Sequence, residues 1–137
     1  MTMTLYGRWQ TRALVLWTAG LLITLLFGLA YGDLLTPLAL LLYVTLLGLG
    51  WDALYHYLQG FRWEGDWPPL FQLFGGLAEG LLVWALASGG LPGVSPALTF
   101  GQFAAHYLTV LLVALALMLG PVKTVFPHWR YRGGQWF

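Results

Sequence analysis

The chain has no cysteine and very little charge. Only 6 of its 137 residues are Lys or Arg and 5 are Asp or Glu, which is 8% of the chain, against about 25% in typical soluble domains. Without cysteine there are no disulfides, thiolate metal sites or cysteine nucleophiles. The sequence also has no phosphate-binding or dinucleotide-binding glycine motif, and no basic run that would indicate a nucleic-acid partner.

Apolar residues dominate the composition, since 59% of the chain is hydrophobic. A disordered chain is excluded, because disorder requires low hydrophobicity and high charge. A soluble domain of this length is excluded as well, because a small domain has too much surface to hide so much apolar area. We therefore predict an all-α, polytopic integral membrane protein, with residues 1–137 forming a single membrane domain.

Four long apolar runs predict a bundle of four transmembrane helices. They cover residues 13–31, 34–58, 68–88 and 96–119. At about 1.5 Å per residue each run can cross the hydrocarbon core of a bilayer. The first run is longer than the 7–15 apolar residues of a signal peptide, so we interpret it as a span. The only sizeable polar loop is 60–67, and the tail is 122–137.

The six cations predict the orientation of the bundle. Two precede the first span, one lies in the 60–67 loop and three lie in the tail, whereas the two opposite connections carry none. Lys and Arg accumulate on the cytoplasmic side of membrane proteins. Both termini and the central loop are therefore expected in the cytoplasm.

Small residues recur at helical spacing in two of the predicted spans. The first span has Gly20, Thr24, Gly28 and Gly32, and the third has Gly76 and Gly80. Such spacing lets a second helix approach closely. The pattern does not say whether that helix belongs to the same chain or to a partner.

Two titratable residues are expected near the middle of the bilayer. Glu79 shares a helix face with Gln72, and His106 shares one with Gln102. Ionisable residues in lipid turn toward the interior of a bundle and pair there. We therefore predict an intramembrane Glu79–His106 contact. It is a structural hydrogen bond, a functional site such as a proton relay, a ligand contact or a lipid headgroup contact, or a face turned toward a partner subunit.

A second group of polar residues is expected near the cytoplasmic surface. It consists of Asp52, His56, Arg62, Glu64, Asp66 and His128. Ion pairs of Asp52 or Glu64 with Arg62 or Arg130 explain the group most simply. A divalent metal or acid–base site is the alternative, but no third ligand is set by spacing, so we predict no metal.

Haem and other cofactors are not expected. A bis-histidine haem needs two histidines at one depth, but His56 and His106 differ by about 18 Å along the bundle axis, from the helical rise. No catalytic residue can be identified from the sequence.

The tail alternates aromatic and cationic residues. They are Trp129, Arg130, Tyr131, Arg132 and Trp136. Rings at the interface and cations beside anionic headgroups would anchor such a segment to the membrane surface. Docking onto a protein partner is the rival interpretation.

Several short motifs resemble those of a group of small bacterial four-span membrane proteins. They are Trp51-Asp52, Tyr55, Gln59, Arg62-Trp63, Asp66-Trp67-Pro68, Phe71-Gln72, Glu79-Gly80, His106-Tyr107, Gly120-Pro121, Phe126-Pro127 and Trp129 to Gly134. The resemblance covers about residues 45–134. That group has no assigned activity, so the resemblance implies a four-span fold and a location in a bacterial plasma membrane, but no function.

Short loops, close-packing faces and the lack of a catalytic motif favour a non-enzymatic role. We expect an accessory or assembly subunit of a membrane complex, or an organiser of the lipid surface, whose partners are the bilayer and other membrane proteins or further copies of the chain. The alternative is an autonomous small transporter or membrane enzyme that uses Glu79 and His106. A cavity of a few hundred cubic ångströms beside these residues would favour the alternative.

Overall fold

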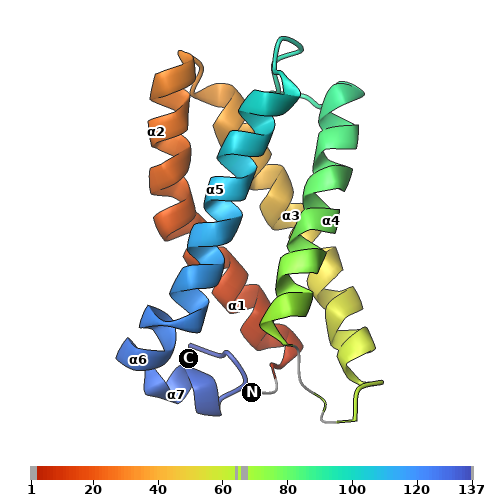
Figure 1. Cartoon of the computed structure of the whole chain (residues 1–137), viewed down its shortest axis with the longest axis vertical. Coiled ribbons are helices and arrows are strands. Elements are labelled where there is room, and N and C mark those ends of the chain that lie inside the picture. Colours follow the sequence, from red (N-terminus) through yellow and green to blue (C-terminus); the bar gives the residue numbers. More distant parts are fainter. Residues whose placement is uncertain (1–2, 64, 66–67, 137) are drawn as a thin grey trace.

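The computed structural model describes residues 3–63, 65 and 68–136, and every regular element in these ranges is a helix. The elements are α1 (Leu5–Val15), the π-helical turn η1 (Leu16–Gly20), α2 (Leu21–Tyr31), α3 (Leu35–Gln59), α4 (Pro69–Ser88), α5 (Phe100–Leu119), α6 (Pro121–Val125) and α7 (Pro127–Tyr131). Figure 1 shows a bundle of four long helical segments with both chain ends at the same end of the bundle. All four segments are long and apolar enough to cross a membrane.

The first helical segment begins eight residues earlier than predicted. It runs continuously from Leu5 to Tyr31 rather than over 13–31. Thr4 caps its start, because the Thr4 hydroxyl accepts a hydrogen bond from the backbone N–H of Gly7 at 3.0 Å. Arg8 and Arg12, which were expected before the span, therefore lie inside the helix.

The other three predicted spans agree with helices α3, α4 and α5 to within four residues at each end, although the fourth helical segment continues past its predicted end to Val125. Local hydrogen bonds explain two of the starts. The Asp33 carboxylate accepts from the backbone N–H of Leu35 at 3.1 Å and from the Thr36 hydroxyl at 2.5 Å, which holds the start of α3. At α5, Thr99 and Gln102 form a reciprocal capping box, so the helix begins at Phe100 rather than 96.

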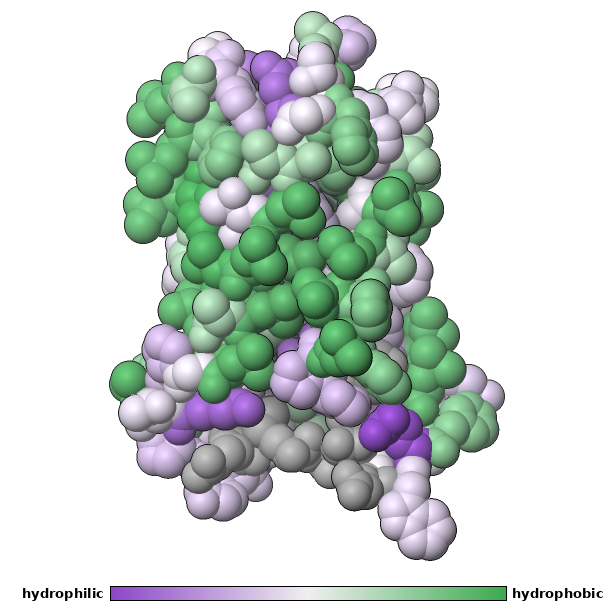
Figure 2. All heavy atoms as spheres, viewed as in Figure 1, coloured by the Kyte–Doolittle hydropathy of each residue, from purple (hydrophilic) through white to green (hydrophobic). Residues whose placement is uncertain are grey.

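The hydrophobic surface residues are concentrated around the middle of the bundle. Figure 2 shows hydrophobic residues over the middle of the visible face and hydrophilic residues toward both ends. This distribution is the one a bilayer requires, because lipid covers the middle of the bundle and water covers its ends.

The glycine faces pack within the chain. A β-carbon at Gly20 would contact Leu41 and Val110 at 3.6 Å, and one at Gly80 would meet the Tyr107 ring at 2.5 Å. Thr24, in the same row as Gly20, is completely buried. Gly20, Gly76 and Gly80 therefore let α3 and α5 approach the first segment and α4, whereas a β-carbon at Gly32 would meet nothing within 4 Å.

Candidate functional site

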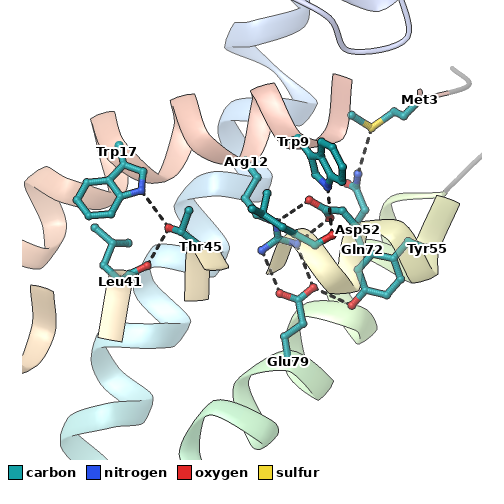
Figure 3. A network of polar contacts seen from close by, with 11 residues as sticks. Met3, Trp9, Arg12, Trp17, Leu41, Thr45, Asp52, Tyr55, Gln72 and Glu79 are labelled. Atoms are coloured by element: carbon teal, nitrogen blue, oxygen red, sulfur yellow. Dashed lines mark hydrogen bonds and ion pairs between the residues drawn. The ribbon is translucent and has the colours of Figure 1, made fainter. Parts of the chain in front are cut away.

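Arg12 joins three of the four long segments through ion pairs. Its Nε and Nη2 donate to the two carboxylate oxygens of Asp52 in α3, at 2.7 and 2.8 Å. Its Nη1 and Nη2 donate to the two oxygens of Glu79 in α4, at 3.1 and 3.2 Å. Figure 3 shows the guanidinium between the two carboxylates. Both contacts are two-point contacts, the strongest geometry available to Arg and a carboxylate.

The network is buried and has further polar partners. The exposed fractions of the side chains are 6% for Asp52, 6% for Glu79 and 15% for Arg12. The Tyr55 hydroxyl donates to Glu79 Oε1 at 2.8 Å, so this oxygen receives two hydrogen bonds. Arg8 is also buried and donates to the side chain of Gln59.

The buried charges of this region cancel. Arg8 and Arg12 carry two positive charges, and Asp52 and Glu79 carry two negative ones. Charges in a low-dielectric interior are tolerated only when they are paired and hydrogen-bonded. Arg12 satisfies both carboxylates at once, so the arrangement holds α1, α3 and α4 together without leaving either carboxylate unpaired.

Glycines make room for the network. A β-carbon at Gly48 of α3 would overlap the guanidinium of Arg12, and one at Gly75 of α4 would lie 2.6 Å from the Tyr55 hydroxyl. Both side chains therefore lie flat against the backbone of a neighbouring helix. The glycine positions in the sequence match the positions at which Arg12 and Tyr55 cross those helices.

Two tryptophans add polar contacts between α1, η1 and α3. The indole N–H of Trp9 donates to the backbone carbonyl of Leu49 at 3.1 Å, and that of Trp17 donates to the Thr45 hydroxyl at 3.0 Å. Thr45 in turn donates to the carbonyl of Leu41 at 2.8 Å. Figure 3 places these contacts on either side of Arg12 along the same interface. They fix the position of the first segment on α3 and hence the position of Arg12.

A cavity of about 120 Å³ lies beside the network. All four long segments contribute to its lining. Arg12, Asp52, Tyr55, Gln72 and Glu79 are among the polar lining residues, and Leu111, Ala114, Leu115 and Met118 of α5 are among the apolar ones. The cavity is smaller than the 300–1,000 Å³ of most small-molecule sites.

The predicted Glu79–His106 contact is wrong. Glu79 binds Arg12 and Tyr55, whereas the Nε2 atom of His106 lies 2.9 Å from the hydroxyl of Thr24 in α2. Successive residues of a helix point about 100° apart. On α5 the face toward α4 is taken by Tyr107, whose hydroxyl donates to the carbonyl of Gly76 at 2.6 Å, so His106 faces α2.

The hydrogen bonds of Thr24 assign the tautomer of His106. The single hydroxyl proton of Thr24 is donated to the carbonyl of Gly20 at 2.7 Å. Nε2 of His106 therefore carries the proton and donates to the Thr24 oxygen. The ring also lies against Phe27, at 5.6 Å between centroids.

The two glutamines grouped with this pair are in different places. Gln72 lines the cavity, with its side-chain nitrogen 3.9 Å from the sulfur of Met3. Gln102 belongs to the capping box of α5, and its backbone carbonyl accepts from the Tyr31 hydroxyl at 2.9 Å. Gln102 therefore acts in the start of α5 and not in the intramembrane network.

The predicted surface cluster does not form around Asp52. Asp52 is buried with Arg12, while His56 is exposed one helical turn further on. The guanidinium of Arg62 lies 4.9 Å from the centre of the Phe71 ring. His128 is exposed, with its ring 6.2 Å from that of Phe126.

Glu64 and Asp66, the other members of this cluster, lie outside the described residues. Among the residues that are described, no group of three or more His, Asp or Glu side chains is arranged to hold a metal ion.

The tail folds back onto the start of α1, which makes the prediction of a membrane anchor wrong for Trp129. This residue is only 2% exposed, and its indole N–H donates to the Thr11 hydroxyl at 2.8 Å. The indole N–H of Trp136 donates to the same hydroxyl oxygen at 3.2 Å. Thr11 itself donates to the carbonyl of Gly134 at 3.0 Å. Both indole N–H groups are therefore bound by Thr11, and the two tryptophans pack against α1 rather than against lipid.

The remaining tail residues are less enclosed. Tyr131 is 77% exposed and Arg132 is exposed, so both can still reach a membrane surface. The side chain of Arg130 lies outside the described part of the structure.

Sequence reasoning missed Arg8, Arg12 and Tyr55 as members of the site, and Arg12 is the one that joins the helices. Arg12 was counted as a cation flanking the first span, because the apolar run begins at Ala13. The available signal was Thr4, a good N-cap residue that allows the helix to begin before both arginines. With the helix extended to Leu5, Arg8 and Arg12 share a face at a spacing of four residues.

Comparisons with protein-family models, with curated proteins and with solved structures found no match to this chain.

Proposed function

We propose that this chain is a non-enzymatic accessory or assembly subunit of a larger membrane complex. The observation that carries the proposal is the pairing of Arg12 with both Asp52 and Glu79. Because the guanidinium occupies both buried carboxylates, neither is available as a general base or as a site for a transported cation. The network instead gives a rigid bundle whose lipid-facing surface is open to other proteins.

The structure of the tail favours a subunit role over a role as an organiser of the lipid surface. The two tryptophans of the tail are held by Thr11 of α1 rather than by the bilayer. The end of the bundle formed by the termini is therefore a folded surface, which is suited to contact with another protein.

We further propose that the protein resides in a bacterial plasma membrane with both termini and the 60–67 loop in the cytoplasm. Both chain ends lie at one end of the bundle (Figure 1). The four Lys and Arg residues of the 60–67 loop and the tail belong to that side of the predicted topology, and Arg8 and Arg12 lie in α1, the half of the first segment nearer this end. The positive-inside rule then supports a cytoplasmic location for this end. The resemblance to small bacterial membrane proteins is consistent with this proposal.

The test is purification of the tagged chain from its own host at native expression in mild detergent, followed by mass spectrometry. A stoichiometric partner that is absent from a control purification of an unrelated four-span protein is the expected result. Recovery of the chain alone, also after chemical cross-linking in the intact membrane, would contradict the proposal.

An autonomous transporter or membrane enzyme is the second candidate, because Glu79 borders the cavity. This candidate requires that Arg12 release Glu79 during a cycle. Proton or solute flux in proteoliposomes that is lost in Glu79→Gln would favour it. His106 has no part in this version, since it binds Thr24.

A further inference from the structure

The cavity beside the network has two chemically different walls. Its charged residues and Gln72 come from α1, α3 and α4. The wall formed by α5 consists of apolar residues and Tyr107, whose hydroxyl is already bound to the carbonyl of Gly76. A ligand that fits both walls has an apolar body and a polar group on one side.

The charges of the lining exclude an ionic ligand. Arg8 and Arg12 balance Asp52 and Glu79, all of which line the cavity. A cation would have to displace Arg12 from hydrogen bonds of 2.7–3.2 Å, and an anion would meet the two carboxylates. Removing a charged ligand from water without a new counter-charge is unfavourable. The lining therefore selects a neutral ligand.

The volume of the cavity is enough for about one ring. A cavity of about 120 Å³ is close to the roughly 150 Å³ of an engineered apolar cavity in another protein that holds benzene. The charged residues of the polar wall are already paired with one another, so the polar group of a ligand would be bound by Gln72. An entirely apolar ring would leave the Gln72 amide without a strong partner, and unpaired buried polar groups are costly.

Gln72 can supply the hydrogen bond that such a ligand needs. Its side-chain nitrogen has a weak contact with the sulfur of Met3 at 3.9 Å. Within the described part of the chain its side-chain oxygen has no hydrogen-bond partner. A neutral amide both donates and accepts, so it can bind a hydroxyl or a carbonyl group.

We propose that this cavity binds a neutral six-membered ring carrying a hydroxyl or carbonyl group, the chemistry shared by phenols and quinone headgroups. The ring lies against Leu111, Ala114 and Leu115, and its polar group faces Gln72. This ligand site goes beyond the proposed subunit role and does not depend on the identity of a partner.

The first experiment measures phenol binding to the full chain in lipid nanodiscs by calorimetry. Ala114→Leu adds three carbons to the apolar wall of the cavity, and we expect it to weaken phenol binding at least tenfold. Ala116→Leu is the matched control, because it makes the same change at an exposed position of the same helix; we expect it to bind phenol as the wild type does. Absence of saturable phenol binding to the wild type, or equal binding by both variants, would overturn the proposal.

The second experiment compares phenol with benzene and remains informative if Ala114→Leu does not fold. We expect the wild type to bind phenol at least tenfold more tightly than benzene, and Gln72→Leu to bring the two affinities together. Equal affinity of the wild type for the two rings would show that the polar wall is not used, which would overturn the proposal.

A competition experiment distinguishes the two possible sources of the ligand, a quinone dissolved in the membrane and a free phenol. A short-chain benzoquinone that displaces phenol from the wild type would identify a ligand dissolved in the membrane. Phenol binding that the quinone does not affect would identify a free phenol. Either result supports the site, whereas phenol displacement by quinone that is equally strong in Ala114→Leu would contradict it.

Discussion

Gly48 of α3 lies against the guanidinium of Arg12 from α1, and a methyl group at position 48 would overlap its Nη1, Cζ and Nε atoms. Glycine within a helix costs about 0.5–1 kcal/mol relative to alanine. Because glycine has no side chain, Arg12 lies flat against α3 and binds both Asp52 and Glu79. The absence of one side chain thus determines how three helices are joined.

Gly48→Ala is expected to lower the stability of the bundle, although alanine is the better helix former. The added methyl group displaces Arg12 from the two carboxylates. Unfolding by SDS titration in mixed micelles measures the effect. The matched control is Gly50→Ala on the same helix, where the new methyl group meets nothing within 4 Å; it is expected to be neutral or stabilising. If the two substitutions change the stability equally, Gly48 is not needed to hold Arg12 in the network.

Arg12→Ala is expected to reduce the free energy of unfolding by about 3–5 kcal/mol, because removing one partner leaves buried charge uncompensated. Arg132→Ala, at an exposed position of the tail, serves as control and is expected to change little. Adding Glu79→Gln to Arg12→Ala removes one carboxylate as well, which leaves Arg8 and Asp52 as buried charges that balance, so part of the stability is expected to return. A strictly additive loss across the two substitutions would contradict the pairing.

Trp129→Phe keeps most of the buried ring and removes the hydrogen bond to Thr11. We expect a loss of about 1 kcal/mol, typical of one buried hydrogen bond, and protease cleavage in 126–136 at lower protease concentration. Trp63→Phe is the control, because Trp63 is 100% exposed. If the tail is cleaved equally readily in both variants, it is not held by Thr11.

The Asp33 cap gives a pH dependence at the end of the bundle opposite the termini. Hydrogen bonds from the hydroxyl and backbone N–H of Thr36 lower the pKa of Asp33 below its usual 3.8. A depressed folded pKa means that the cap stabilises the protein above pH 3.8 and that this contribution is lost as the pH falls through the folded pKa. Thermal melting of wild type and Asp33→Asn between pH 6 and 2 is the measurement. Asparagine also caps helices but does not titrate, so the variant is expected to lose less stability in acid; identical acid profiles would refute this role for Asp33.

The orientation of the bundle in the membrane can be tested by labelling introduced cysteines. The chain contains no cysteine of its own, so the wild type gives no labelling. Ala97→Cys lies in the exposed connection between α4 and α5, and Trp63→Cys lies in the loop between α3 and α4. An impermeant maleimide added to intact cells is expected to label Ala97→Cys, and Trp63→Cys only after the membrane is permeabilised. The reverse pattern would invert the proposed topology.

Residue patterns predicted the spans well because a helix in lipid is a local structure. Its backbone hydrogen bonds are made within the segment, so length and apolar composition are sufficient signals. Helices α3, α4 and α5 agree with three of the predicted spans to within four residues at each end. The start of the first span differs more from the prediction. Its N-cap, Thr4, lies before the apolar run, so Arg8 and Arg12 are part of the helix.

The sequence by itself determined that this is an all-helical chain with four segments long and apolar enough to cross a membrane, and that Glu79 and His106 lie within those segments. Only the tertiary structure decided their partners. A helix turns about 100° per residue, so the rotation of each helix in the bundle assigns Glu79 to Arg12 and His106 to Thr24. That rotation depends on the packing of all four segments, including glycines such as Gly48, and no single segment contains this information.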